Sequence, residues 1–254
     1  MTAAFSGALI DIDGTLLHGD DPIPGAAQAI ARLRERRIPF RLSTNTTRRS
    51  RRVISEVLRS AGIDVAPAEI VAPSSLARLA VMEAGNPGAA LLIPDAARED
   101  FEGVAESPDP AIVVVGDLGR GFTFERLNEA FRWLRSGASL LALHRNPWWS
   151  AGAEGAQLDA GAFVAALEYA SGVTARVVGK PSADFYRLAV SELGLPAGRV
   201  VSVGDSLRND GLGAAEAGCL AFLVRTGVFD ADELARSSWR PDAVLDSIAG
   251  FPGA

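Results

Sequence analysis

Short apolar runs alternate with amphipathic segments along this chain, and that alternation restricts its fold more than any other feature. Short apolar runs predict buried strands, and apolar positions that recur every three or four residues predict helices that cover them. The expected elements are strands at 8–12, 40–42, 200–203 and 221–224, and helices at 24–37, 49–60, 183–193 and 213–217. Strands separated by helices form βαβ units, so we expect an α/β protein with a Rossmann-like parallel sheet.

The middle of the chain has an alternation of its own. Strands are expected at 89–93, 112–115 and 140–143, and helices at 76–84, 124–135 and 162–169. The 254 residues also exceed the usual length of one domain, about 100 to 200 residues. We therefore predict a core formed by residues 1–75 and 178–254, with an α/β cap domain inserted at 76–177.

Composition excludes several classes of protein. With 48% hydrophobic and 22% charged residues, the chain has the profile of a folded protein, and its net charge of −6 argues against a nucleic-acid binder. Apolar runs such as 111–115 are far shorter than the roughly 18 residues of a membrane span. No signal peptide is recognisable, so we expect a cytoplasmic protein without a membrane segment. The single cysteine, Cys219, cannot form an internal disulfide, and we expect it to be buried.

Two aspartates end the first expected strand. Asp11 and Asp13 are two residues apart on an extended segment, so both side chains should point to one side at the carboxyl end of the strand, where open α/β sheets bind ligands. Paired carboxylates repel each other unless a cation neutralises them, and Mg²⁺ suits a site of few carboxylates, water and phosphate. A plain Asp-x-Asp-Gly turn is the alternative explanation.

Three further motifs end strands or begin helices. Thr44 follows the second strand and precedes a helix start, where a hydroxyl and backbone N–H groups can bind an anion. Lys180 is the sole lysine among 25 basic residues and lies just before an expected helix, where the helix dipole disfavours a cation unless an anion binds there. Asp205 ends a later strand, and Asp210 follows five residues on. We expect Asp205 to complete the metal site and Asp210 to brace the lysine or a metal-bound water.

In these motifs the chain resembles the haloacid dehalogenase-like superfamily of phosphatases with a C2-type cap. The resemblance rests on Asp11-x-Asp13-Gly14-Thr15, Thr44-Asn45, Gly179-Lys180-Pro181 and Gly204-Asp205 with Asp210. Further matches, including Ile23-Pro24-Gly25 and Val177-Val178, resemble the subfamily that contains phospholysine phosphohistidine inorganic pyrophosphate phosphatase. One departure is Asn209, where relatives often carry a second aspartate.

The resemblance implies a Mg²⁺-dependent phosphatase of small phosphate esters, phosphoramidates or pyrophosphate. It implies Mg²⁺ held by Asp11, Asp205 and the backbone carbonyl of Asp13. Asp11 would attack phosphorus, Asp13 would act as acid and base, and Lys180 with Thr44 would clamp the phosphoryl group, supported by Asn45 and Asp210. The partner would be a small phosphorylated substrate, and a homodimer through the cap domain is a further expectation.

Cap residues are the expected source of substrate selectivity. The loop at 144–149 follows a cap strand, and the resemblance implies that Asn146 hydrogen-bonds a leaving group and that Trp148 stacks on it, although Trp148 could simply pack. Asp159 opens the next helix and is a further candidate for this face. The basic cluster of Arg48, Arg49, Arg51 and Arg52 is interpreted as a solvated helix face, with substrate steering as the alternative. Asp117 only imitates the Gly-Asp motif, and His18 is expected at the surface.

Two other functions remain open. A phosphotransferase or mutase would share the aspartyl-phosphate intermediate and differ only in the acceptor of the phosphoryl group. A binding module without chemistry would typically carry a Gly-x-Gly-x-x-Gly turn after the first strand, and residues 13–16 do not form one.

Overall fold

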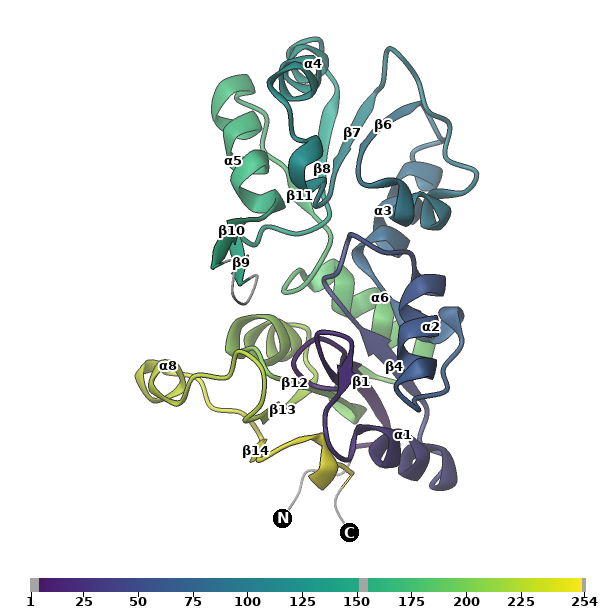
Figure 1. Ribbon diagram of the computed structural model, residues 1–254, viewed down its shortest axis with the longest axis vertical. Coiled ribbons are helices and arrows are strands. Elements are labelled where there is room, and N and C mark those ends of the chain that lie inside the picture. The colour runs from purple at the N-terminus through teal and green to yellow at the C-terminus, as the bar shows by residue number, and fades with distance from the viewer. Residues whose placement is uncertain (1–4, 151–154, 253–254) are drawn as a thin grey trace. The chain divides into compact units, whose positions relative to one another are not determined.

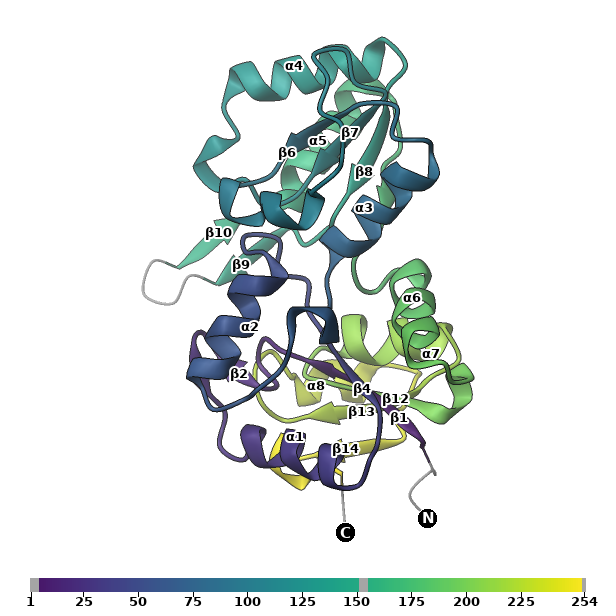
Figure 2. The ribbon, with the colours of Figure 1, turned by 90° about the vertical axis from the view of Figure 1, so that its right-hand side faces the viewer.

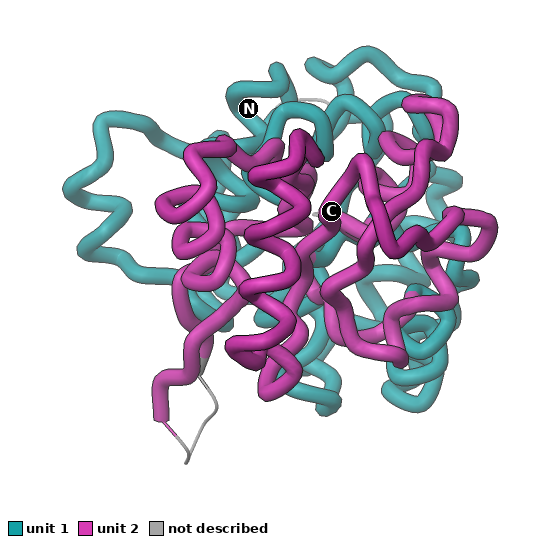
Figure 3. The backbone as a smooth tube through the Cα atoms, turned by 90° about the horizontal axis from the view of Figure 1, so that it is seen from above, with its two compact units in different colours: residues 1–44, 51–71, 180–254 teal, residues 45–50, 72–179 magenta. Residues whose placement is uncertain are grey.

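The computed structural model describes residues 5–150 and 155–252, which form two compact units (Figure 3). Unit 1 comprises residues 1–44, 51–71 and 180–254, and unit 2 comprises residues 45–50 and 72–179. These ranges differ from the predicted domain boundaries at 72–75 and 178–179, and the segment 45–50 was not expected in the second unit. Its hydrogen bonds explain the assignment, because Ser50 N donates to Ala96 O and Thr47 Oγ1 accepts from Asp117 N.

Unit 1 is built on a six-stranded sheet in which all neighbouring strands are parallel (Figure 1). The strand order is β14-β13-β12-β1-β4-β5. The chain runs from β1 outward through β4 and β5, and later from β12 outward through β13 and β14, so the order reverses between β1 and β12. The strands are β1 (Gly7–Asp11), β4 (Phe40–Ser43), β5 (Ile70–Val71), β12 (Val200–Gly204), β13 (Leu220–Val224) and β14 (Ala243–Leu245). Such a reversal is where open α/β sheets bind their ligands, beyond the carboxyl ends of the strands.

Helices cover this sheet with their apolar faces. Helix α1 buries Ala26, Ala29, Ile30 and Leu33, the spacing of one helical face, and these residues share an apolar cluster with Ile10 of β1. The helices are α1 (Ala26–Glu35), α2 (Arg51–Ser60), α6 (Ala183–Leu193), α7 (Gly213–Glu216) and α8 (Ala231–Arg236). Shorter elements are the hairpin β2 (Leu17–His18) and β3 (Asp21–Pro22), the 3₁₀ turns η1 (Pro67–Glu69), η5 (Ala197–Arg199) and η7 (Ile248–Gly250), and the π-helical turn η6 (Leu207–Leu212).

Unit 2 contains a second parallel sheet, with strand order β11-β8-β7-β6, of which β6, β7 and β8 are labelled in Figure 2. Its strands are β6 (Ala89–Leu92), β7 (Ile112–Val115), β8 (Ser139–Ala142) and β11 (Arg176–Val177), and β9 (Trp148–Ser150) pairs antiparallel with β10 (Ala156–Leu158). Its helices are α3 (Pro73–Glu83), α4 (Phe124–Arg135) and α5 (Ala160–Ser171), with 3₁₀ turns η2 (Asp95–Phe101) and η3 (Gly119–Gly121). Helices α4 and α5 share an apolar cluster with β6, β7 and β8.

The predicted α/β class with parallel sheets is confirmed. The longer strands and helices lie close to their predicted positions, whereas the short strands β5, β11 and β14 were not predicted because two or three residues are too few to show a period. Helix α3 starts at Pro73 rather than at the predicted residue 76, since proline is favoured in the first turn of a helix. Among the described residues, no helix is long and apolar enough to cross a membrane.

Candidate active site

Three neighbouring strands of unit 1 end at the point where the strand order reverses. Asp11 is the last residue of β1 and is paired in register with Ser43, the last residue of β4. On the other side of β1 lies β12, which ends at Gly204, so Asp205 follows directly. Because parallel strands finish at the same edge, side chains far apart in the sequence meet here, as the sequence predicted.

Lys180 occupies the centre of this edge. Its ammonium lies 2.5 Å from Asp11 Oδ1 and 2.8 Å from Asp210 Oδ1, and the side chain is almost completely buried. Burial by itself would lower the pKa of Lys180, but Asp11 and Asp210 outweigh it and the net pKa is raised well above its ordinary value. The ammonium is therefore a permanent, enclosed point charge.

Asp11 and Asp13 have different surroundings although they are only two residues apart. Asp11 is buried and accepts a hydrogen bond from Thr15 Oγ1 at 3.3 Å, whereas Asp13 is exposed. Thr44 donates its hydroxyl proton to Asp13 Oδ2 at 2.8 Å. The first aspartate is thus fixed and enclosed, and the second is held by Thr44 where solvent reaches it.

Glycines make room for the remaining two carboxylates. Gly14 and Gly227 both have positive φ angles, and a Cβ on either would lie 2.0 or 1.7 Å from Asp205 Oδ2. The same oxygen accepts a hydrogen bond from Val228 N at 2.7 Å. A Cβ at Gly204 would lie 2.2 Å from Asp210 Cγ. No side chain other than hydrogen is compatible with these close approaches.

The turn η6 carries Asp210 and is held mainly through its backbone. Asp210 Oδ2 accepts from Ser206 N at 3.1 Å, and Asn209 N donates to Ser206 Oγ at 3.1 Å. The hydroxyl of Tyr186, a buried residue of α6, donates to the carbonyl oxygen of Asn209. Asn209 therefore contributes to the site through its peptide groups, so the turn forms without a carboxylate at this position.

The cluster contains more carboxyl groups than cationic groups. Asp11, Asp205 and Asp210 each offer a carboxylate oxygen, and these oxygens lie within 4.8 Å of one another. Burial raises the pKa of Asp11 well above its ordinary value, against the opposing effect of Lys180, and burial together with Asp210 raises the pKa of Asp205 to about 7. Three buried carboxylates thus face a single ammonium.

A divalent cation would stabilise the ionised form of these three carboxyl groups. The donors are all carboxylate oxygens, the ligands that Mg²⁺ prefers in proteins, and no cysteine or histidine is among them. The side-chain cluster includes Asp210 rather than Asp13, which was predicted to act through its backbone carbonyl. The residues present are therefore able to hold the ion that the sequence predicts.

The predicted site residues of the cap belong to unit 2, and two of them have evident structural partners. Asp159 is the N-cap of α5, where its Oδ1 accepts from Ala160 N at 2.7 Å and lies 3.5 Å from His144 Nε2. Asn146 donates its backbone N–H to His144 Nδ1 at 3.3 Å. Trp148, in β9, leaves 58% of its surface exposed. Asn45 also belongs to unit 2, where a Cβ at Gly179 would lie 2.8 Å from Asn45 Oδ1.

Sequence reasoning missed a polar network in unit 2, in which Thr47, Asp117 and His144 are buried and Arg48 is exposed. Thr47 Oγ1 lies 3.4 Å from His144 Nε2, and Arg48 Nε pairs with Asp117 Oδ2 at 2.5 Å. Burial lowers the pKa of His144 below its ordinary value, although Asp159 opposes this, so the ring is neutral near pH 7. Two features of the sequence could have indicated this network: the Gly116-Asp117 pair and the basic cluster that begins at Arg48.

One interpretation of the sequence needs correction and two are confirmed. Arg48 and Arg49 precede α2 rather than lying on its face, and the Arg48 guanidinium lies over the Trp149 ring, 4.6 Å from its centroid. Asp117 lies two residues beyond the end of β7 and pairs with Arg48. Cys219 is buried, which raises the pKa of its thiol to about 11, and His18 is exposed.

Comparisons with known proteins agree with this geometry. A sequence profile of haloacid dehalogenase-like hydrolases matches residues 8–104, and a second profile of HAD-hydrolase-like proteins matches residues 177–251. The chain is 34% identical to phospholysine phosphohistidine inorganic pyrophosphate phosphatase of Bos taurus, over 97% of this chain and 93% of that protein. It belongs to the haloacid dehalogenase-like hydrolase family.

Other members of the family are similar over nearly the whole chain. Haloacid dehalogenase-like hydrolase domain-containing protein 2 of Homo sapiens is 38% identical, over 99% of this chain and 95% of that protein. The crystal structure of 4-nitrophenylphosphatase from Thermotoga maritima is similar with a TM-score of 0.90 and 28% identity, over 96% of this chain and 95% of that one. The chain is accordingly a haloacid dehalogenase-like hydrolase whose named relatives include phosphatases.

Proposed function

We propose that this protein hydrolyses phosphate esters of small molecules in a Mg²⁺-dependent reaction, with Asp11 as the nucleophile. The observation that carries the proposal is the buried carboxylate of Asp11 at the end of β1, 2.5 Å from the buried ammonium of Lys180. A nucleophile needs a fixed position and a counter-charge for the oxygens of the group it attacks, and Lys180 supplies both. The phosphatases among the relatives support the same reaction class.

In the first step Asp11 attacks phosphorus and the bond from phosphorus to the leaving oxygen breaks. The protonated Asp13 carboxyl gives its proton to that oxygen, so the product leaves as an alcohol and the phosphoryl group remains on Asp11 as an acyl phosphate. Thr44, which donates to Asp13 Oδ2, keeps the carboxyl in one orientation.

In the second step water attacks phosphorus, and Asp13, now ionised, takes a proton from that water. The bond from phosphorus to Asp11 breaks, which releases inorganic phosphate and restores the carboxylate. The ammonium of Lys180 neutralises charge on the phosphoryl oxygens in both steps, held in place by Asp210. Mg²⁺, held by Asp11 and Asp205 with the Asp13 carbonyl, would supply further neutralisation of the same oxygens.

The test is a panel of phosphate compounds assayed with Mg²⁺ and with EDTA. The panel contains 4-nitrophenyl phosphate, phosphohistidine, phospholysine and pyrophosphate, because the names of the relatives point to these compounds, and sugar phosphates as further small esters. We expect Mg²⁺-dependent phosphate release from at least one compound, and a phosphoryl group that appears transiently on the wild-type protein. Asp11→Asn should show neither. Phosphate release from no compound would refute the proposal, and transfer to added alcohols in place of water would favour a phosphotransferase. The homodimer stays a prediction, which the molar mass in solution tests.

A further inference from the structure

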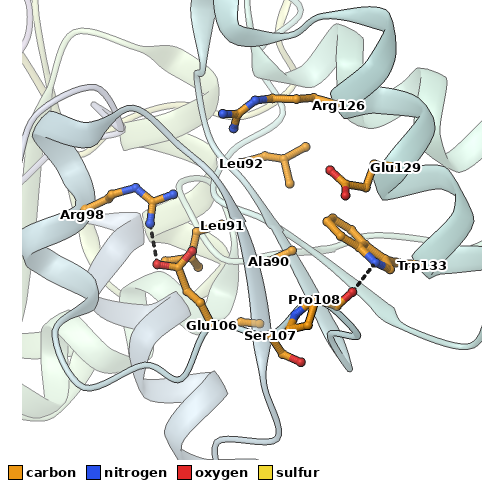
Figure 4. A pocket seen from close by; sticks show the side chains of 11 residues that line it. Ala90, Leu91, Leu92, Arg98, Glu106, Ser107, Pro108, Arg126, Glu129 and Trp133 are labelled. Carbon is orange, nitrogen blue, oxygen red and sulfur yellow. Dashed lines mark hydrogen bonds and ion pairs between the residues drawn. The ribbon is translucent and has the colours of Figure 1, made fainter.

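A cavity of about 240 Å³ opens at the edge of the sheet in unit 2 (Figure 4). It lies against β6, the last strand in the order β11-β8-β7-β6, and is bordered by α4 and by the segments around Arg98 and Glu106. None of its lining residues belongs to the site of the proposed reaction. The cavity therefore needs an explanation of its own.

The cavity has a mixed lining, in which apolar side chains form part of the floor and one wall beside polar and charged groups. Ala90 and Leu92 of β6 are buried and belong to the apolar cluster beneath α4. The indole of Trp133 forms a wall, and its Nε1 already donates to Pro108 O at 3.1 Å (Figure 4). With that polar atom satisfied, the ring offers the cavity an apolar surface against which an aliphatic group can pack.

Four charged side chains line the rim, and two of them form an ion pair with each other. Arg98 pairs with Glu106 at 2.5 Å, on the side away from α4 (Figure 4). Arg126 and Glu129 of α4 lie three residues apart, on the helical face that also carries Trp133. Among the described residues, neither of these two side chains has an ion-pair partner. One positive and one negative group, both exposed to solvent, are thus available beside the buried Ala90 and Leu92.

We propose that this cavity binds an α-amino acid with an aliphatic side chain. The carboxylate would pair with Arg126, the ammonium with Glu129, and the side chain would lie over Ala90 and Leu92 beside Trp133. The four charged lining residues sum to zero, so a plain anion would meet Glu106 and Glu129, and a plain cation would meet the two arginines. The volume is below the roughly 300 to 1,000 Å³ of pockets for drug-sized ligands, which limits the occupant to a small metabolite.

The experiment is isothermal calorimetry on the full chain with L-leucine as the probe. Two analogues each lack one charge: 4-methylpentanoate has no ammonium, and 3-methylbutylamine has no carboxylate. We expect L-leucine to bind and each analogue to bind at least about tenfold more weakly, since a hydrogen-bonded charge contributes about 10- to 100-fold. Arg126→Gln and Glu129→Gln should each weaken L-leucine binding by a similar factor.

Matched controls come from the same helix. Arg132 and Glu125 are exposed residues of α4 that do not line the cavity, so Arg132→Gln and Glu125→Gln should leave binding unchanged. Trp133→Phe gives an independent readout, because L-leucine should change the tryptophan fluorescence of the wild type but much less that of this variant. Asp11→Asn should bind L-leucine normally, which separates this proposal from that of the phosphatase reaction.

Several results would overturn the proposal. No binding heat with L-leucine up to about 10 mM would do so, since that excludes even millimolar affinity. Equal binding of 4-methylpentanoate, or binding unchanged in both Arg126→Gln and Glu129→Gln, would show that the charges are not used. A doubled molar mass in the wild type that Arg126→Gln abolishes, without L-leucine binding, would assign the cavity to an interface between two copies.

Discussion

Raising the pH should destabilise the metal-free protein through Asp205. Burial and the neighbouring Asp210 raise the pKa of Asp205 from 3.8 to about 7 in the folded state. Between these two pH values the Asp205 carboxyl keeps its proton in the folded protein but has lost it in the unfolded chain. The contribution of Asp205 to the free energy of unfolding is therefore fully present below about pH 4 and is lost as the pH rises to about 7. Each pH unit corresponds to about 1.4 kcal/mol, which gives a total loss of about 4 kcal/mol. That is a large share of the 5 to 15 kcal/mol typical of a folded protein.

The assay is urea unfolding in EDTA at a series of pH values from about 4 to about 8. Asp205→Asn is the matched control, because an amide has the same shape, its oxygen can still accept from Val228 N, and it does not titrate. The free energy of unfolding of the wild type, relative to that of this variant, should fall by about 4 kcal/mol across the series. Added Mg²⁺ should restore stability at the upper end, by about 3 kcal/mol at a hundred times its Kd, since it binds only the folded, ionised cluster.

A flat difference between the wild type and Asp205→Asn would refute this reasoning. It would mean that Asp205 ionises at an ordinary pH despite its burial, and that the three carboxylates of the cluster do not repel one another strongly. A Mg²⁺ effect of equal size in Asp205→Asn would separately show that the ion binds elsewhere.

Three substitutions test the rest of the site. Asp11→Asn should lower turnover by at least about 10⁴-fold without unfolding the protein, as judged by circular dichroism, and multiple turnover in this variant would exclude direct attack. Lys180→Arg should lower kcat by about 10²-fold, because a planar guanidinium cannot replace a compact ammonium between two carboxylates; near wild-type rates would contradict this. Gly204→Ala should cost at least about 1 to 3 kcal/mol in urea unfolding and disturb Asp210, whereas Gly250→Ala, with open space around its Cβ position, should cost under about 0.5 kcal/mol. Equal losses in these two glycine variants would show that the close approach at Gly204 has no energetic weight.

Much of the site could be read from local sequence. Strand-sized apolar runs end just before or at Asp11, Thr44 and Asp205, and parallel strands bring their carboxyl ends to one edge of the sheet, so the meeting of these residues needs no knowledge of their packing. Composition pointed to Lys180 as well, because it is the only lysine of the chain. Residue type and strand position were sufficient here because backbone geometry alone fixes where a strand ends.

Contacts between side chains from different elements were not readable in this way. The pairing of Arg48 with Asp117, 69 residues apart in the sequence, and the closeness of Thr47 and His144 depend on how strands and loops of unit 2 pack. The assignment of 45–50 to unit 2 has the same origin. No periodicity in a six-residue segment indicates which unit its backbone will join.

The sequence by itself therefore determined the α/β class, the parallel sheets and the identity of the strand-end carboxylates, because hydrophobic period and strand direction are properties of single segments. Tertiary structure decided the electrostatics. Only packing encloses Asp11, Asp205 and Asp210 around Lys180 and raises the pKa of Asp205 to about 7, since desolvation depends on every element that covers a side chain. Tertiary structure also decided that the carbonyl oxygen of Asn209 accepts a hydrogen bond from Tyr186. The packing of α4 and β6 likewise leaves a cavity that is lined in part by charged side chains.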